Sequence, residues 1–210
     1  MLVTDRRRFP TPKPDEGIAR AEAEVIEEIL GRGVEIVQLR EKDLDGAALL
    51  RRALRLRQIC DAHGARLVVN GRVDVAVAAS ADGVHLPVGG VSVPDARRLL
   101  PRGALVGCSV HHQEELSRVG DADYVIFGPI FETPSKPGYG PARGPAGLRA
   151  MVASAAMPVL AIGGIGPENA ASVWEAGAAG IAMMGAPLAN PACLDSLEFR
   201  KRRSLFNREA

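Results

Sequence analysis

The sequence has few aromatic residues and few cysteines. Aromatic side chains make up 4% of the 210 residues, so the core must be built from valine, leucine, isoleucine and alanine, which suits strands buried on both faces and covered by helices. The three cysteines, Cys60, Cys108 and Cys193, lie far apart. Their spacing excludes a disulfide framework and a cysteine-based zinc site, and favours a reducing compartment.

A strong charge imbalance and long apolar runs are also absent. The formal net charge of +1 gives no support for binding nucleic acid or an anionic membrane. No apolar run approaches the roughly 20 residues that cross a membrane, and the first residues contain no apolar signal core. We therefore expect a cytoplasmic protein with neither a nucleic-acid nor a membrane partner.

The sequence instead alternates short apolar runs with helix-like segments. Eight runs have the character of buried strands: 2–4, 34–39, 66–69, 83–86, 105–109, 124–128, 159–162 and 180–184. Several segments between them place apolar residues three and four positions apart, which is typical of a helix with one face on a sheet. The pattern predicts a single domain over 1–210, an α/β protein folded as a closed (β/α)₈ TIM barrel, with a charged C-terminal tail from about residue 195.

Polar residues cluster at or just after the ends of the predicted strands. In a barrel these positions meet at one face, where the reactive groups belong. They supply Gln38, Arg40, Lys42, Asn70, His85, Ser109 and His111. Cations, amides and hydroxyls with few carboxylates favour an anionic ligand that carries phosphate. An ion pair with a neighbouring loop is an alternative role for Arg40 and Lys42.

Two loops add to this prediction. The stretch AIGGIGPEN, residues 161–169, contains Gly163 and Gly164, which would let successive backbone N–H groups face one phosphate. A tight turn with no ligand is the alternative, and the pattern is not a dinucleotide fingerprint. The loop after the sixth strand, 131–144, is long and rich in glycine and proline, which is typical of a lid or a binding loop.

Several motifs together carry a family resemblance. They are VQLREK (37–42), NGRVD (70–74), DGVHLP (82–87), GCSVHH (107–112), DADYVIFGPIFETPSK (121–136) and AIGGIGPEN (161–169). In this order and spacing the chain resembles the thiamine phosphate synthase/TenI family. The resemblance implies a (β/α)₈ barrel, a homodimer, and binding of the phosphorylated hydroxyethyl-methylthiazole of thiamine biosynthesis.

In the synthase branch, the thiazole nitrogen displaces pyrophosphate from hydroxymethylpyrimidine diphosphate with the help of Mg²⁺. The resemblance assigns Gln38 to the pyrimidine and the Gly163–Gly164 turn to the thiazole phosphate. It places Thr133 and Ser135 in the strand-six loop, and it assigns five residues to the pyrophosphate: Arg40, Lys42, Asn70, Ser109 and Lys136.

The chain departs from both branches of the family. Synthases have a magnesium-binding aspartate where this chain has Gly71, and residues 87–91 contain no acid for the second ligand, so we expect no metal site. The TenI branch contains thiazole tautomerases, which need no metal, but Pro129 replaces their histidine base. Gly185 replaces the phosphate-binding serine and leaves only a backbone N–H.

Three functions follow from this pattern. The first prediction is a TenI-like thiazole tautomerase without a cofactor, in which His111 or His85 replaces the base and Lys136 is a further catalytic candidate. The second is a thiamine-phosphate synthase with an altered Mg²⁺ site. The third is a non-catalytic protein that binds thiazole phosphate or thiamine phosphate in a regulatory role.

Overall fold

The computed structural model describes residues 1–9, 16–132 and 141–197, with the side chains of 16–20 excepted. Eight parallel strands form one sheet in chain order: β1 (Leu2–Val3), β2 (Ile36–Leu39), β3 (Arg66–Asn70), β4 (Gly83–Leu86), β5 (Leu105–Val110), β6 (Tyr124–Phe127), β7 (Val159–Ile162) and β8 (Gly180–Ala182). The Val3 N–H donates to Met183 O at 2.8 Å, and the Met183 N–H donates to Met1 O at 3.0 Å. These bonds join the last strand to the first, and the predicted barrel is confirmed.

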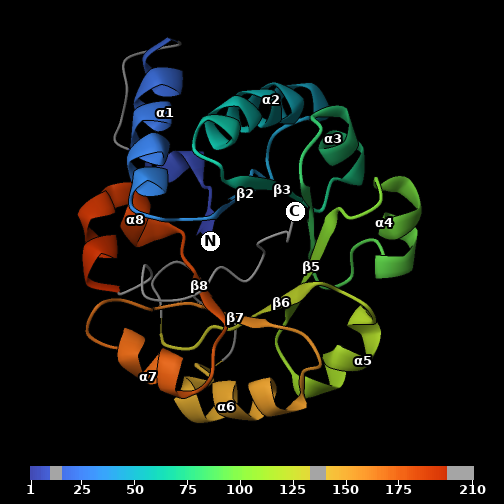
Figure 1. Ribbon diagram of the computed structural model, residues 1–210, viewed down its shortest axis with the longest axis vertical. Helices are drawn as coiled ribbons and strands as arrows, with labels where there is room; N and C mark the ends of the chain where they lie inside the picture. The colour runs from blue at the N-terminus through green and yellow to red at the C-terminus, as the bar shows by residue number, and fades with distance from the viewer. Residues whose placement is uncertain (10–15, 133–140, 198–210) are drawn as a thin grey trace.

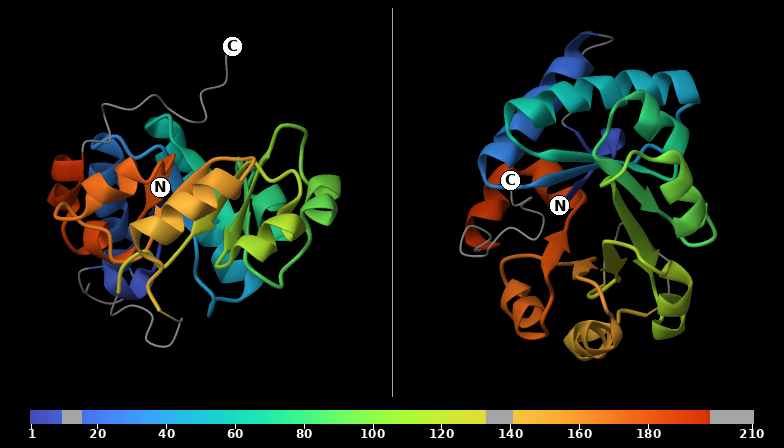
Figure 2. Two further views of the ribbon diagram at one scale, coloured as in Figure 1. Left: turned by 90° about the horizontal axis from the view of Figure 1, so that it is seen from below. Right: turned by 45° about the vertical axis from the view of Figure 1, so that its right-hand side comes forward.

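Helices surround the ring of strands, as Figure 1 shows. They are α1 (Glu16–Gly31), α2 (Gly46–Ala62), α3 (Val73–Ala78), α4 (Val93–Leu99), α5 (Leu116–Val119), α6 (Gly144–Ser154), α7 (Ala170–Glu175) and α8 (Gly185–Ala189), with the short 3₁₀ helices η1 (Arg6–Arg8), η2 (Gln113–Glu115) and η3 (Pro191–Leu197). The side views of Figure 2 show the same outer layer of helices. None of the described helices is long and apolar enough to cross a membrane.

Aspartates fix the turns that lead from helices into strands. Asp82, just before β4, accepts the Leu67 N–H at 2.8 Å and pairs with Arg57 of α2. Asp123, just before β6, accepts the Val106 N–H at 2.6 Å. Each carboxylate satisfies a backbone donor of the preceding strand, so the ADG and DADY stretches hold neighbouring units together.

The strands place alternate side chains on opposite sides of the barrel wall. On β6, Val125 and Phe127 pack outward in the cluster shared with the helices, whereas Tyr124 and Ile126 point inward. The inward group fills the barrel interior together with Val3, Leu160 and Ala182. This period of two explains why the strand sequences are apolar at almost every position.

Gly107 of β5 leaves the room that the ring of Tyr124 occupies. A Cβ at this position would lie 2.0 Å from Tyr124 Cζ, and the ring is fully buried. We expect Gly107→Ala to lower the free energy of unfolding by about 1–3 kcal/mol, because overpacking forces the ring or the strand to shift. Urea unfolding measures this. Gly31→Ala is the control, since a Cβ there has open space, and equal stability of the two variants would contradict the prediction.

Candidate functional site

A cavity of about 200 Å³ opens at the carboxyl ends of the strands. Every strand contributes a lining residue at or near its end: Val3, Gln38, Asn70, His85, Ser109, Ile126, Ile162 and Ala182. Within the described residues, the lining contains no aspartate and no glutamate. The site therefore combines an apolar wall with polar groups that are neutral or positively charged.

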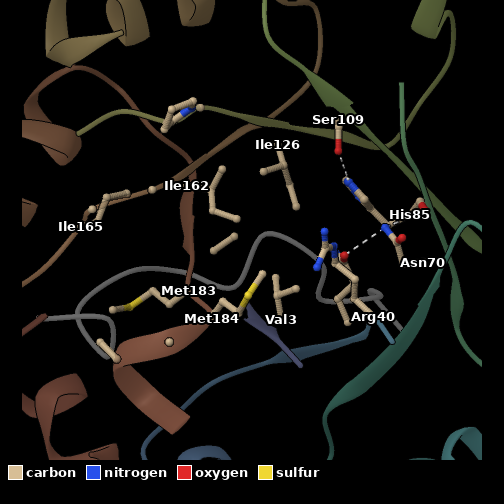
Figure 3. Close-up of a pocket in the computed structure, with 18 of the residues that line it drawn as sticks. Val3, Arg40, Asn70, His85, Ser109, Ile126, Ile162, Ile165, Met183 and Met184 are labelled. Carbon is tan, nitrogen blue, oxygen red and sulfur yellow. Dashed lines mark hydrogen bonds between the residues drawn. The ribbon is translucent and has the colours of Figure 1, made fainter. Parts of the chain in front are cut away.

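Figure 3 shows the polar side chains gathered on one side of the cavity. Asn70 Nδ2 donates to Gln38 Oε1 at 3.2 Å, and His85 Nε2 lies 2.8 Å from Ser109 Oγ. Arg40 reaches the same region, and among the described residues no carboxylate pairs with its guanidinium. This side, which we call the polar end, offers a cation and several donors to an anionic ligand.

Glu41, the residue after Arg40, turns away from the cavity. It is buried and accepts hydrogen bonds from Thr4 Oγ1 and from the Arg6 N–H, both at 3.0 Å. The Arg40 N–H in turn donates to Thr4 Oγ1 at 3.0 Å. This network fixes the chain just beyond β2 in the direction that carries the Arg40 side chain into the pocket.

Lys42 does not lie with Arg40 in the lining of the cavity. It is exposed, lies in a turn and does not line the cavity. Side chains alternate with a period of two only along a strand, and β2 ends at Leu39, so Lys42 need not point to the same side as Arg40. Thr133, Ser135 and Lys136 lie outside the described residues, so their roles stay predictions.

The opposite side of the cavity, which we call the glycine end, is formed by backbone. Gly163 has φ +102° and Gly164 has φ +61°, and within the described residues no hydrogen bond uses their N–H groups. Asn169 holds the turn by accepting from the Gly166 N–H at 2.9 Å and donating to Gly164 O at 2.8 Å. The Gly166 N–H is thus engaged, so the run of N–H groups predicted for this stretch is shorter than expected.

Gly185 lines the cavity beside this turn. A Cβ there would lie 3.2 Å from Arg8 Nη1, the far end of a flexible side chain that can move aside. Because glycine has no side chain, only backbone atoms of this position face the cavity, and their binding of phosphate stays a prediction.

His85 is a buried neutral histidine. Its ring stacks on Tyr124, with ring centroids 5.8 Å apart and an interplanar angle of 26°. Burial, and secondarily the charge of Arg40, lower its pKa to about 3. Such a ring is a poor proton acceptor near neutral pH, which weakens its candidacy as the relocated base.

The lowered pKa of His85 predicts a pH dependence of stability. In the unfolded chain the histidine takes up a proton below about pH 6.5, whereas in the folded chain its pKa is about 3. The wild-type protein therefore loses stability as the pH falls through this window. Glutamine does not titrate, so His85→Gln lacks this effect. We therefore expect the free energy of unfolding of the wild type to fall by about 2 kcal/mol more than that of His85→Gln between about pH 7.5 and pH 5. Urea unfolding at both pH values measures it, and a constant difference would contradict the prediction.

His111 also lines the cavity. Its Nδ1 lies 2.9 Å from Gly128 O, which can only accept, so Nδ1 carries a proton and donates this hydrogen bond. The Glu115 carboxylate receives the His111 N–H at 2.5 Å. His112 diverges toward Arg143, with 3.2 Å between Nε2 and Nη2. Of the two candidate bases, His111 is only partly buried whereas His85 is fully buried, so His111 is the more accessible one.

Sequence reasoning missed the apolar wall of the cavity. Val3, Ile126, Ile162 and Met183 lie between the two ends. The signal that identifies them is their position, because each is an inward-facing residue at or just beyond the end of a strand. An aromatic heterocycle would pack against such side chains.

Comparison with known proteins agrees with this geometry. The sequence model of a family described as thiamine monophosphate synthase matches residues 2–186. The chain belongs to this family. The predicted family resemblance is thereby confirmed, although the match does not separate the synthase branch from the TenI branch.

Individual members of the thiamine monophosphate synthase family give a finer comparison. A thiamine-phosphate synthase of Methanospirillum hungatei is 42% identical over 170 residues, which cover 80% of this chain and 82% of that protein. A thiamine biosynthesis bifunctional protein of Symbiobacterium thermophilum is 45% identical over 170 residues, but the match spans only 35% of its length. The solved structure of a thiamine phosphate pyrophosphorylase of Pyrococcus furiosus superposes with a TM-score of 0.79 at 32% identity, covering 95% of this chain and 92% of that chain.

The comparisons support the enzyme prediction and its place in thiamine biosynthesis. Among the predicted reactions they favour the synthase, which was the second prediction, over the tautomerase, which no comparison tests. The homodimer, the cytoplasmic location and the absence of a cofactor also stay predictions.

Proposed function

We propose that the chain is a thiamine-phosphate synthase that joins hydroxymethylpyrimidine diphosphate to hydroxyethyl-methylthiazole phosphate. The observation that supports this proposal is that one cavity is lined by a group of polar and cationic side chains, by the Gly163–Gly164 turn, and by apolar side chains. The names of relatives such as the Methanospirillum hungatei synthase support it.

Two ends are what a reaction between two phosphorylated substrates requires. The polar end, with Arg40, Asn70 and Ser109, offers a cation and hydrogen-bond donors to pyrophosphate. The glycine end, at Gly163 and Gly164, offers backbone N–H groups to the single phosphate of the thiazole. A tautomerase has one phosphorylated substrate and needs only one such end.

In the proposed reaction the thiazole nitrogen attacks the methylene carbon of the pyrimidine substrate. A carbon–nitrogen bond forms, the carbon–oxygen bond to the diphosphate breaks, and pyrophosphate leaves with the electron pair. Negative charge grows on the leaving oxygens, so donors held in place at the polar end stabilise the transition state more than the ground state. The apolar wall between the ends would hold the two rings against each other.

The cavity does not fit a magnesium ion held by protein carboxylates. Mg²⁺ prefers carboxylate and other hard oxygen ligands, and the lining within the described residues contains no carboxylate. Gly71 occupies the position of one expected ligand, with φ +69° and a Cβ position 3.6 Å from Pro87. An ion at this site would take its oxygen ligands mainly from substrate phosphates and water.

The proposed function is tested by incubating the purified protein with both substrates and measuring release of pyrophosphate and formation of thiamine phosphate. The assay is run with each substrate alone and over a range of Mg²⁺ concentrations. We expect pyrophosphate only when both substrates are present. If no pyrophosphate is released at any Mg²⁺ concentration, the chain is not a synthase. Binding of thiazole phosphate with neither synthase nor tautomerase activity would indicate a non-catalytic binding protein.

The tautomerase is a second candidate because of one observation. The ring of His111 lines the cavity, and Gly128 O accepts a hydrogen bond from its Nδ1, so a neutral ring would have Nε2 as its basic nitrogen. This function predicts metal-independent aromatisation of the carboxythiazole phosphate, followed by ultraviolet absorbance. Loss of that reaction in His111→Asn would support it.

A further inference from the structure

The hydrogen bond between His85 and Ser109 joins a buried ring to a hydroxyl on the cavity wall. His85 Nε2 and Ser109 Oγ are 2.8 Å apart, on the neighbouring strands β4 and β5. Two proton arrangements fit this distance, because a neutral imidazole nitrogen either donates or accepts and a hydroxyl does both.

The other ring nitrogen favours one of these arrangements. Within the described part of the chain, His85 Nδ1 is buried and has no hydrogen-bond partner. If Nδ1 carried the proton, a buried N–H donor would be left without an acceptor, which is rare in native proteins. If Nε2 carries it, the donor is satisfied by Ser109 and only a lone pair lacks a partner. A positively charged ring would again leave the Nδ1 donor unsatisfied.

The charge of the cavity favours the same arrangement. When His85 donates to Ser109, the hydroxyl hydrogen of Ser109 is available to the cavity, which Ser109 lines. Arg40 and Asn70 lie on the same side (Figure 3), so all of these groups would donate toward one ligand. In the reverse arrangement Ser109 would present only lone pairs, which repel an anion.

The surroundings of His85 hold its ring in this orientation. Its side chain is 2% exposed and stacks on Tyr124. Tyr124 in turn occupies the space left by Gly107, the residue paired with His85 across β4 and β5. Burial and the stack on Tyr124 hold the ring with Nε2 directed at Ser109.

We propose that His85 is a positioning residue: it donates its Nε2–H to Ser109 Oγ and thereby directs the Ser109 hydroxyl hydrogen at the pyrophosphate group. The identity of this anion rests on the proposed function, whereas the proton arrangement does not. His85 then acts through Ser109 and not as an acid or base.

The proton arrangement is read directly from the wild-type protein. Nitrogen-15 NMR of histidine-labelled protein distinguishes the two neutral tautomers and the charged ring. We expect His85 in the Nε2–H form, unchanged between about pH 5 and pH 8. An Nδ1–H tautomer or a charged ring in this range would overturn the proposal.

A double-mutant cycle tests whether His85 acts through Ser109. Binding of inorganic pyrophosphate is measured for wild type, His85→Leu, Ser109→Ala and the double variant. Loss of a directed donor to an anion predicts that His85→Leu weakens binding roughly tenfold to a hundredfold. In the Ser109→Ala background the same change should matter less than about threefold. Equal losses in both backgrounds, or a wild-type protein that does not bind pyrophosphate, would overturn the proposal.

Rescue and specificity separate positioning from a general structural defect. His85→Gln places an amide N–H near the position of Nε2 and should restore most of the pyrophosphate affinity. Affinity for thiazole phosphate, which is assigned to the glycine end, should change less than about threefold in all variants. If the protein has no synthase activity but the double-mutant cycle shows the expected coupling, the proposed function is wrong and the positioning role of His85 stands. If the protein is an active synthase but His85 and Ser109 show no coupling, the positioning role is wrong and the proposed function stands.

Discussion

Replacing Arg40 with methionine should lower the rate of pyrophosphate release roughly a hundredfold to a thousandfold. Arg40 is the charged side chain of the polar end among the described lining residues, and removing one donor from a developing anion costs about this much. Methionine keeps the length of the side chain and removes the charge. Steady-state kinetics with both substrates measures the effect on kcat/KM.

Arg72→Met is the matched control for Arg40. Arg72 follows the next strand, β3, but its Nη2 pairs with Asp74 Oδ2 at 2.6 Å, and it does not line the cavity. We expect its kcat/KM to stay within about threefold of wild type. Affinity for thiazole phosphate should be unchanged in both variants, and an equal loss of activity in the two would contradict the role of Arg40.

Replacing Gly164 with alanine should weaken thiazole phosphate binding roughly a hundredfold or more. Its φ of +61° is unfavourable for alanine. A Cβ there would also lie 2.5 Å from Glu132 O, and this backbone atom can move only if the chain around it shifts. The turn must therefore shift and lose the alignment of the N–H groups of Gly163 and Gly164. Two hydrogen bonds to a charged group account for a loss of this size.

Titration calorimetry with thiazole phosphate and with inorganic pyrophosphate measures the two ends of the cavity separately. Gly164→Ala should keep its pyrophosphate affinity within about threefold, the opposite pattern to Arg40→Met. Gly31→Ala introduces the same methyl group in open space and should bind both ligands like wild type. A similar loss for both ligands in Gly164→Ala would mean that the two ends are not independent.

The sequence allowed the fold to be predicted because the strands are buried on both faces. The runs 83–86 and 159–162 coincide with β4 and β7, since Asp82 comes just before the first and Pro158 just before the second. Other strand ends differ by one or two residues, as at β2, which was predicted from 34 and begins at Ile36. That difference reflects backbone pairing with the neighbouring strand, which an apolar run alone does not specify.

The site could be predicted only in part. The sequence shows that Arg40, Asn70 and Ser109 lie at or just after strand ends, and the structure brings them together at the polar end. The position of Lys42 could not be predicted, because it depends on where β2 stops. The lowered pKa of His85 could not be predicted from the sequence either, because it depends on the burial of the ring and on the nearby charge of Arg40.

The buried side chain of Tyr124, beneath the cavity, affects how small molecules enter and leave the site. Because Tyr124 and its neighbours fill the barrel interior below the cavity, the barrel is a packed core and not a pore. If the chain is the proposed synthase, both substrates would enter and both products would leave through the same opening at the carboxyl ends of the strands. A product that dissociates slowly would then block the binding of the next pair of substrates.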